Sequence, residues 1–365
     1  MASYGGTGTL TGNAYGDLSA ADAFTFQKRM LPIAKKLLTF QRFAQKETKP
    51  QKEGLEIRWR RYNKFALNTN PISEGVTPDF DQVSHETLRA TLKQYGGWVP
   101  ITDVLQAVAQ DPVLQQITEK QAIQAAEVLD TLTFDIAKAG TYKGVAGPDT
   151  TAARTTVEYT IGLSIGKTDS NYGGASAYQS PSTTLIDTAI PALEAEDANK
   201  LNTMVLPSPD YNTTPIRPSY VAVGHTDLRQ DVEALPDFIP VEKYSGQSGT
   251  HEGEIGSCHG VRFILTTMAS SFADAGHADG VTQKLKSTTE TVADVYPVII
   301  FAQDAMGCVS LSGKDSLRSK VVLPKPSSTD PIGQRGSSAW DTFYVCKRLD
   351  EKFLYRLEVG CSSLA

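Results

Sequence analysis

The sequence predicts an α+β fold, in which helices and strands are mixed along the chain without regular βαβ alternation. Two observations carry this prediction. Residues 112–139 repeat apolar side chains at helical spacing, with neither Gly nor Pro after Pro112. Short apolar runs typical of strands follow at 220–223, 261–266 and 295–302. The 365 residues are enough for about two ordinary domains or one elaborated domain with a real hydrophobic core.

The N-terminal region divides into a tail and a helix. Residues 1–16 are rich in Gly, Thr and Ser and have no periodicity, which is typical of a flexible tail. Asp17 or Ser19 can cap a helix whose apolar residues recur at helical spacing as far as Phe40. Pro32 should kink this helix or divide it in two. We therefore expect an amphipathic, basic helix close to the N-terminus.

A long two-stranded ribbon is predicted next. Residues 55–62 (LEIRWRRY) alternate apolar and polar side chains, as does the first part of 84–99. Between them, residues 68–81 contain two prolines and a glycine and are typical of a loop. A two-stranded ribbon is only marginally stable in water by itself, so this one needs another surface to lie on.

The remaining elements surround one long helix. Asp111 and Pro112 form a strong helix start, and Gly140 is a natural C-cap, so the helix should be about 40 Å long. We expect a second helix over 182–199, interrupted by its proline at position 191. The intervening segment, 141–181, is rich in Gly, Ser, Thr and Tyr, with a strand-like centre at 155–161.

The formal net charge of −6 is unevenly distributed. Residues 1–64 contain twelve Lys and Arg against five Asp and Glu, a balance of +7, so residues 65–365 carry −13. Such a basic arm can bind nucleic acid, lie on the acidic surface of another copy, or simply form a solvated face. Three aromatic residues interrupt the basic run, and no nucleic-acid-binding module is recognisable.

Motifs that carry catalytic chemistry are incomplete. Residues 162–166 match the G-x-S-x-G pattern, and 166–168 (GKT) echo a phosphate-binding loop, but no helical pattern follows either motif. A hydrolase using Ser164 is therefore a minor alternative. His251, Cys258 and His259 match no structural zinc spacing. We expect no enzyme activity, no cofactor and no metal site.

Cysteine spacing and hydropathy bound the environment of the protein. The four cysteines contain no CxxC pair and are expected to be buried free thiols. The longest apolar run, 295–302, is far too short to span a bilayer. The first residues have no basic and apolar regions of a secretory signal, so we expect synthesis in the cytoplasm.

A series of short motifs runs in order between residues 85 and 360. They are GG at 96–97 leading to TD at 102–103, DLR at 227–229, FIPVEKY at 238–244, GEIG at 253–256, GVRF at 260–263, YPVII at 296–300, DAMG at 304–307, DPIGQRG at 330–336, AW at 339–340, and the closing strand 353–359. In this order the motifs resemble the coat proteins of tailed bacteriophages, closest to the Enquatrovirus-type major capsid proteins. The tail before residue 20 and the segment 141–181 match poorly.

This resemblance implies the Johnson capsid fold, with an N-terminal arm, an extended loop, a peripheral domain built on a long spine helix, and an axial domain. The implied divisions are 1–50 for the arm; 51–99 for the extended loop; 100–181 for the peripheral domain, with its spine helix at 112–139 and an inserted segment; 182–235 and 270–325 for the two parts of the axial domain; 236–269 for a peripheral β-hairpin; and 326–365 for a C-terminal return to the peripheral sheet.

The resemblance further implies a major capsid protein that self-assembles into hexamers and pentamers of an icosahedral head around double-stranded DNA. Implied partners are a separate scaffolding protein, a portal and a decoration protein, with synthesis in the cytoplasm of a host bacterium and no membrane. The basic arm and loop would contact acidic surfaces of neighbouring copies. The residues expected in these contacts are Lys28, Arg29, Lys35, Lys36, Arg42, Arg58, Arg60, Arg61 and Lys64. The alternative is a basic-armed nucleic-acid-binding protein that forms no shell.

Overall fold

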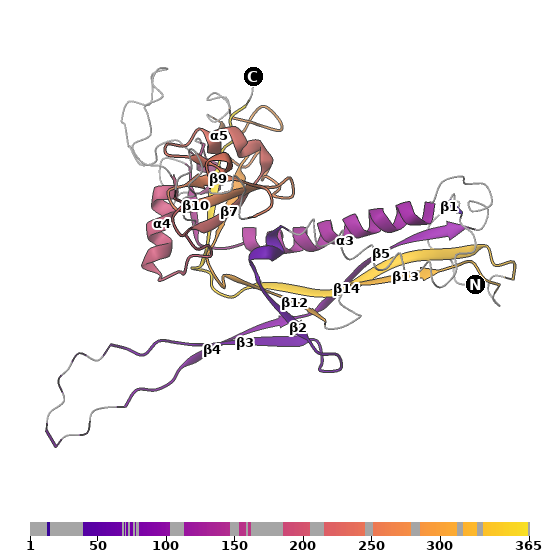
Figure 1. Cartoon of the computed structure of the whole chain (residues 1–365), viewed down its shortest axis with the longest axis horizontal. Helices are drawn as coiled ribbons and strands as arrows, with labels where there is room; N and C mark the ends of the chain where they lie inside the picture. The colour runs from indigo at the N-terminus through magenta and orange to yellow at the C-terminus, as the bar shows by residue number, and fades with distance from the viewer. Residues whose placement is uncertain are drawn as a thin grey trace.

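The computed structural model contains two larger β-sheets, a separate two-stranded hairpin and one long helix (Figure 1). It describes residues 13–14, 39–67, 69, 71, 74–75, 77, 80–102, 113–146, 153–157, 160–161, 185–204, 215–244, 251–278, 285–311, 317–326 and 331–363. No helix among these residues is long and apolar enough to cross a membrane.

A six-stranded sheet is organised around its longest strand. Its members are β1 (Asn13–Ala14), β5 (Lys93–Thr102), β14 (Arg335–Arg348), β12 (Met306–Leu311) and β2 (Gln45–Lys49) in that order, with β13 (Arg318–Val322) also on β14. β14 pairs antiparallel with β5 along ten positions, and with β12 and β13 on its other edge. Segments from the N-terminal, central and C-terminal parts of the chain therefore meet on β14.

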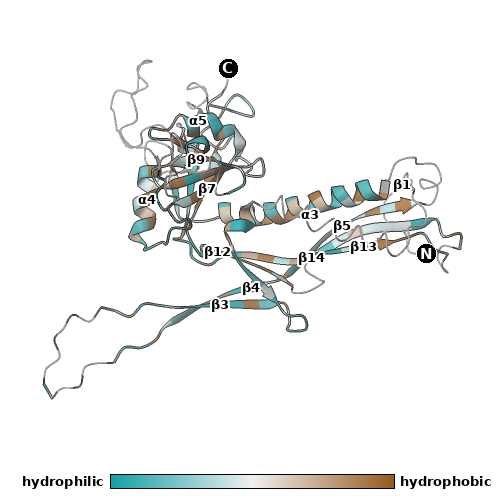
Figure 2. Cartoon of the chain, in the orientation of Figure 1, coloured by the Kyte–Doolittle hydropathy of each residue, from teal (hydrophilic) through white to brown (hydrophobic). Residues whose placement is uncertain are grey.

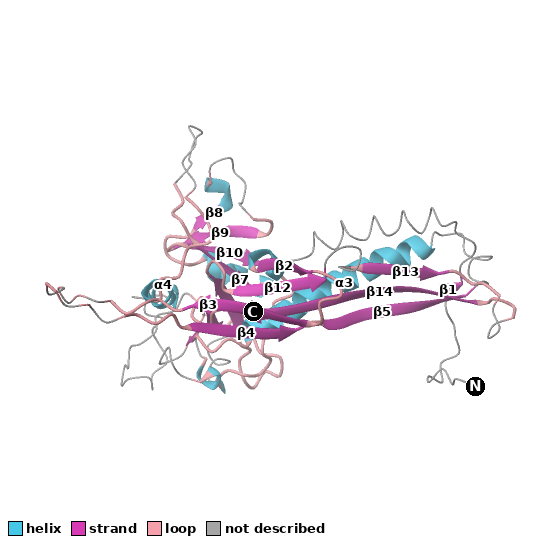
Figure 3. Cartoon of the chain, turned by 90° about the horizontal axis from the view of Figure 1, so that it is seen from below, coloured by secondary structure: helices cyan, strands magenta, loops and turns pink. Residues whose placement is uncertain are grey.

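The helix α3 (Val113–Lys138) lies along one face of this sheet (Figures 1 and 3). Every second residue of β14 from Ser338 to Cys346 is buried, as expected for a strand with one covered face. Much of the contact is polar: Gln121 and Ser338 exchange two hydrogen bonds of 2.7 and 2.8 Å, and the Thr133 and Tyr344 hydroxyls lie 2.8 Å apart. These buried pairs fix the register of the helix along the strand.

A seven-stranded sheet forms the second body. Its order is β6 (Lys143–Val145), β15 (Leu354–Val359), β11 (Tyr296–Phe301), β7 (Tyr220–Gly224), β10 (Val261–Leu265), β9 (Glu254–Cys258) and β8 (Ile239–Pro240). Two helices, α4 (Leu185–Ala195) and α5 (Arg229–Glu233), contribute apolar side chains to its core. Short 3₁₀ helices lie at η1 (Phe40–Phe43), η2 (Arg154–Thr156), η3 (Thr226–Leu228) and η4 (Val241–Lys243).

The end of α3 is held by β15. Arg356 donates hydrogen bonds to the carbonyl oxygens of Lys138 and Gly140, the latter at 2.7 Å. A cation at this position satisfies carbonyl groups that a helix end leaves without partners. Glu358 is fully buried and forms ion pairs with Arg356 at 2.9 Å and Arg154 at 2.7 Å. The helix of one sheet is thereby attached to a strand of the other.

The chain that leads into β2 is fixed to the middle of α3. Phe40 is fully buried, and its ring lies 5.0 Å from that of Phe134 and 6.5 Å from that of Phe301. The carboxylate oxygen Oδ1 of Asp130 accepts hydrogen bonds from the backbone N–H groups of Phe40 at 2.7 Å and Thr39 at 3.1 Å. These contacts position the N-terminal segment where it joins the sheet.

Several expected elements are confirmed with shifted ends. The long helix, the three apolar strands and the first ribbon strand are observed as α3, β7, β10, β11 and β3 (Glu56–Tyr62). Where one second ribbon strand is expected, the structure has two strands. β4 (His85–Thr91) pairs with β3, whereas β5 pairs with β14. The buried Leu92 separates them, so the hairpin ends before the expected residue 99.

Two local expectations are wrong. Pro191 lies inside α4 and does not interrupt it, since burial of Ile186, Ala189 and Leu193 keeps the helix continuous despite the lost backbone hydrogen bond. The strand expected at 155–161 is replaced by η2 and an isolated bridge between Thr160 and Gly360.

Other expectations concern residues outside those described. They are the helix from residue 17, the helix start at 111–112, and most of 141–181.

The expected division of the C-terminal half differs from the observed sheets. Residues 236–269 were expected with the spine helix, yet β8, β9 and β10 belong to the seven-stranded sheet, because β10 pairs in parallel with β7. Conversely, β12 and β13 lie within 270–325 but pair with β14 in the six-stranded sheet. Residues 326–365 divide between the sheets, as β14 joins one and β15 the other.

The buried carboxyl group of Asp130 makes stability depend on pH. Burial raises the pKa of Asp130 from 3.8 to about 6. A folded-state pKa above the unfolded value gives a contribution that is complete below about pH 4 and is lost as pH rises through about 6. The loss corresponds to about 3 kcal/mol at about 1.4 kcal/mol per pKa unit.

We expect Asp130→Asn to remove this part of the pH dependence, because the amide keeps an acceptor for the Phe40 N–H but does not ionise. Denaturant unfolding between pH 4 and 7 would show the wild type losing more stability than the variant. Parallel curves for the two proteins would contradict the assignment.

Candidate inter-subunit interface

The hairpin formed by β3 and β4 extends away from the two sheets (Figures 1 and 3). Its seven paired positions run from Glu56 opposite Thr91 to Tyr62 opposite His85. Half-buried and exposed side chains alternate along the first part of β3, and Figure 2 shows the strand as mainly hydrophilic. Both faces are largely accessible to solvent, since no residue of β3 or β4 is fully buried. The chain itself therefore provides little support for this hairpin.

Large apolar side chains are concentrated on the hairpin and its connecting loop. More than half of the exposed large hydrophobic residues among those described lie between positions 55 and 83, with Leu67 94% and Phe80 82% exposed. The full set there is Leu55, Tyr62, Phe65, Leu67, Phe80 and Val83. Exposed apolar surface gathered in one segment is typical of a site that binds a protein, a membrane or a ligand. The contact residues expected from the sequence are all Lys or Arg and include none of this set. Six large apolar residues in a predicted exposed ribbon were nevertheless a visible signal.

Charge changes sign along the hairpin. Residues 65–84 contain three acidic residues, Glu74, Asp79 and Asp81, and no Lys, Arg or His. The rest of the hairpin, here called its base, is basic on balance, because five Lys and Arg stand against Glu56 and Glu86; the five are Arg58, Arg60, Arg61, Lys64 and Arg89. The basic arm inferred from the sequence thus ends in an acidic, apolar loop.

Of the nine basic residues expected in contacts, the structure describes five, and four of these five have carboxylate partners within their own chain. The side chains lie 3.4 Å apart for Arg42 and Glu252, 2.9 Å for Arg58 and Glu56, 2.8 Å for Arg61 and Glu86, and 2.9 Å for Lys64 and Asp197. Arg61 also pairs with Asp350, in the connection between β14 and β15. Arg60 is exposed and makes no ion pair with a described residue. Lys28, Arg29, Lys35 and Lys36 lie outside the described residues.

These ion pairs are exposed and therefore weak. The hydrogen bond from Arg58 lowers the pKa of Glu56, and that from Lys64 lowers the pKa of Asp197. Solvent and salt screen such pairs, so each contributes little to stability. A carboxylate of another copy can therefore replace the intrachain partner at small cost.

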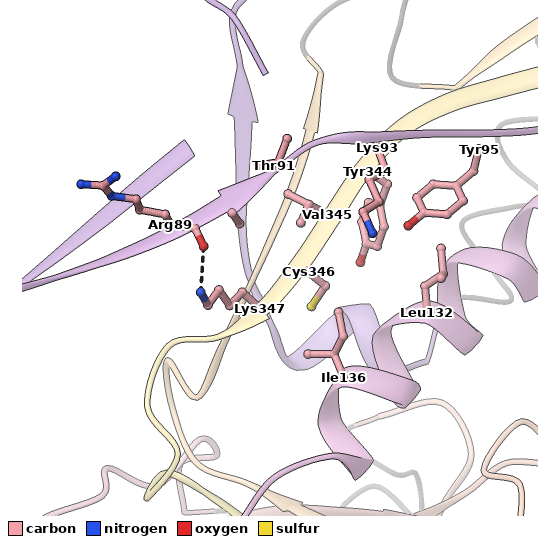
Figure 4. Close-up of a pocket in the computed structure, with 11 residues that line it drawn as sticks. Arg89, Thr91, Lys93, Tyr95, Leu132, Ile136, Tyr344, Val345, Cys346 and Lys347 are labelled. Atoms are coloured by element: carbon pink, nitrogen blue, oxygen red, sulfur yellow. Dashed lines mark hydrogen bonds between the residues drawn. The ribbon is translucent and has the colours of Figure 1, made fainter. Parts of the chain in front are cut away.

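A cavity of about 370 Å³ lies at the base of the hairpin, between β4, β5, β14 and α3 (Figure 4). Apolar side chains such as Leu132 and Ile136 line it on the helix side, with Cys346 on β14. Arg89, Lys93 and Lys347 supply its charges, and none of its lining residues is acidic. The Lys347 Nζ donates to the Arg89 carbonyl oxygen at 2.7 Å and joins β14 to β4.

The candidate metal ligands are separated in the structure. The His251 ring lies 2.9 Å from the Asn202 amide oxygen, and the His259 ring lies 2.5 Å from the Asp187 carboxylate. The Cys258 thiol donates to a carbonyl oxygen. Among the described residues, no group of three or more His, Cys, Asp or Glu side chains is arranged to hold a metal ion. Ser164 and its motif lie outside those residues.

Comparisons with known proteins give a consistent result. A family model described as phage capsid protein matches residues 85–309, more than half of the chain. A search of curated proteins found no match.

Among solved structures, the capsid of Ralstonia phage GP4 is 12% identical over 88% of each chain, with a TM-score of 0.58. The cyanophage Pam1 capsid is 9% identical over 99% of this chain and 98% of that one, with a TM-score of 0.54. The mature capsid of bacteriophage PhiM1 is 12% identical over 88% and 87%, with a TM-score of 0.52. These likenesses confirm the α+β Johnson fold.

Arg60 and Arg61 form a matched pair for testing how the hairpin is held. They are neighbours on β3, but only Arg61 reaches both β4 and Asp350. We expect Arg61→Ala to increase amide hydrogen exchange in the hairpin and around residue 350, with less than about 1 kcal/mol change in stability. Arg60→Ala should leave exchange unchanged in both places. Equal exchange in the two variants would show that the Asp350 pair does not hold the hairpin.

Proposed function

The chain belongs to the phage capsid protein family and is a shell-forming major capsid protein of a phage head. From that premise we propose how its subunits contact one another in the shell. The subunits form hexamers and pentamers, and the β3–β4 hairpin of each one lies on a neighbouring copy. Contacts of modest area become stable in a closed shell because each subunit is held by several neighbours at once.

We assign the parts of the fold as follows. The six-stranded sheet with α3 is the peripheral domain and its spine helix, and the seven-stranded sheet with α4 and α5 is the axial domain. The β3–β4 hairpin with its loop is the extended loop. The sheet memberships and the position of α3 support this division. In this proposed division the domain boundaries differ from those expected at residues 99, 236 and 326.

One observation carries the proposal: the apolar residues of the extended loop are exposed in the isolated chain. Leu67 and Phe80 are almost completely accessible to water. Burying one large apolar side chain contributes roughly 1.5–3 kcal/mol, so covering Leu67 and Phe80 together stabilises a contact by several kcal/mol. We therefore infer that this loop lies against another protein surface in the assembled state. A shell of repeated subunits provides such a surface for the loop of every subunit.

The charge pattern supports head-to-tail contacts between copies. The loop between residues 65 and 84 is acidic, whereas the base of the hairpin and the nearby cavity are basic. An acidic loop from one copy is complementary to the basic base of another, which fixes the register of the contact. We propose Arg42, Arg58, Arg60, Arg61 and Lys64 as residues of this contact. We propose the same for Lys28, Arg29, Lys35 and Lys36 of the N-terminal arm.

The remaining assignments rest on the resemblance of the sequence. We propose that the protein is closest to the Enquatrovirus-type coat proteins and is synthesised in the cytoplasm of a host bacterium. A separate scaffolding protein, a portal and a decoration protein are its proposed partners, with packaged double-stranded DNA in non-specific contact. Its role in this proposal is structural and not enzymatic.

Replacing the two most exposed loop residues tests the apolar contact. We expect Leu67→Ser with Phe80→Ser to prevent shell formation, while the melting temperature of the subunit stays unchanged because both side chains are already in water. The matched control, Leu67→Met with Phe80→Tyr, keeps the apolar surface and should still form shells. Sedimentation and electron microscopy would distinguish megadalton particles from free subunits. Normal particles from the serine variant would refute the loop contact.

Charge reversal tests the electrostatic part. We expect the triple change of Arg58, Arg60 and Arg61 to Glu to leave a folded subunit that forms no shells. Arg60→Glu alone should weaken assembly without disturbing an ion pair seen within the described chain. Unaltered particles from the triple variant would argue against the charge register. Nucleic-acid binding with steep salt dependence and no particles would instead favour the basic-armed binding protein.

A further inference from the structure

Two cysteines face each other across neighbouring strands of the six-stranded sheet. Cys308 on β12 lies directly opposite Cys346 on β14 in the antiparallel register. Their sulfur atoms are 2.8 Å apart, and both residues are almost completely buried. Both thiols are free. The pair lies in the core that α3 shares with the two sheets.

This geometry needs little change to form a disulfide. Residues directly opposite in antiparallel strands have Cα atoms roughly 4.5–5.5 Å apart. Disulfides occur at Cα separations of roughly 4.4–6.8 Å, with a bond of about 2.05 Å. The two sulfurs therefore have to approach by less than about 1 Å, which side-chain rotation provides without moving either strand.

The chemical surroundings distinguish this pair from the other cysteines. Within the pair, the Cys308 thiol donates a hydrogen bond to the Cys346 sulfur at 2.8 Å. Cys258 and Cys361 each donate to a backbone carbonyl, at 3.2 and 3.3 Å, and burial raises the pKa of both to about 12. Those two thiols are inert controls within the same chain.

The cavity at the base of the hairpin gives access to the pair. Cys346 is part of its lining, and its volume of about 370 Å³ matches a small organic molecule (Figure 4). Arg89, Lys93 and Lys347 surround it without an acidic lining residue, so an anionic molecule is favoured over a cationic one.

We propose that Cys308 and Cys346 are an oxidation site that forms an intrachain disulfide by exchange with a small, anionic disulfide entering this cavity. In the first step the Cys346 sulfur attacks the reagent, forming a mixed disulfide and releasing one thiol. In the second step the Cys308 sulfur attacks Cys346, forming the protein disulfide and releasing the second thiol. The two cysteines lose two electrons and two protons, and the reagent gains them.

The disulfide would join β12 to β14, across 38 positions of sequence. A covalent link of this length restricts the unfolded chain and raises stability. The reducing cytoplasm keeps such thiols reduced, whereas an extracellular environment permits the bond. This inference does not depend on assembly, because the pair, the cavity and the register all lie within one subunit.

Peptide mapping of the oxidised subunit tests the site. The purified, reduced protein is treated with dithiodiglycolate, quenched in acid, alkylated and digested with trypsin. We expect peptides 287–314 and 336–347 to be joined, with a mass lower by two hydrogen atoms, while Cys258 and Cys361 are alkylated. The melting temperature should rise by several degrees on oxidation. Cys308→Ser and Cys346→Ser should show neither the joined peptides nor the rise.

Charge-matched reagents test the route. For each reagent, the oxidation rate of the folded protein is divided by the oxidation rate of the unfolded chain. This ratio is then compared between dianionic dithiodiglycolate and dicationic cystamine. We expect the folded protein to favour the anionic reagent by at least about tenfold, as electrostatic focusing in a charged cleft predicts. Equal ratios would overturn entry through the cavity. A mixed disulfide that persists at Cys346, or no reaction of the folded protein, would overturn the proposed site.

Discussion

Polar and apolar contacts between α3 and β14 hold together segments from all parts of the chain. The Gln121–Ser338 and Thr133–Tyr344 pairs fix the helix along the strand, and Asp130 fixes the segment at Phe40 that leads into β2. At the helix end, the buried Arg356–Glu358 pair brings in the seven-stranded sheet. Apolar residues of both sheets and of α3 belong to one core. A shift of α3 would therefore disturb both sheets.

The course of the chain out of this core explains why the hairpin is left unsupported. The buried Leu92 ends β4, and the chain then continues as β5 along β14. Everything before Leu92 in the hairpin depends on its own cross-strand pairs and on a few exposed ion pairs, of which Arg61–Asp350 reaches the body. A two-stranded hairpin of this kind is marginal in water. The sequence predicts that this ribbon needs a second surface, and in the proposed shell the exposed apolar loop makes that contact.

The sequence predicted elements whose signal is local and apolar. The run without Gly or Pro identified α3, and β-branched runs identified β7, β10 and β11. It did not predict β14, because the buried positions of that strand include Ser338, Thr342 and Cys346, which hide the alternation. Ser338 pairs with Gln121 on α3, and Tyr344 on the same face of the strand pairs with Thr133, so only the pairing makes burial of these polar groups favourable. Sheet membership likewise depended on distant pairing, such as β10 with β7, that no local pattern contains.

The separation of charge and apolar surface along the hairpin assigns them different physical roles. Exposed ion pairs such as Lys64–Asp197 contribute little to stability and can exchange partners, so in the proposed contact they select the register more than the strength. In the proposed contact, Leu67 and Phe80 supply the strength, because covering these exposed side chains removes apolar surface from water. Each such contact is weak by itself. The closed shell becomes stable because each subunit makes several of them simultaneously.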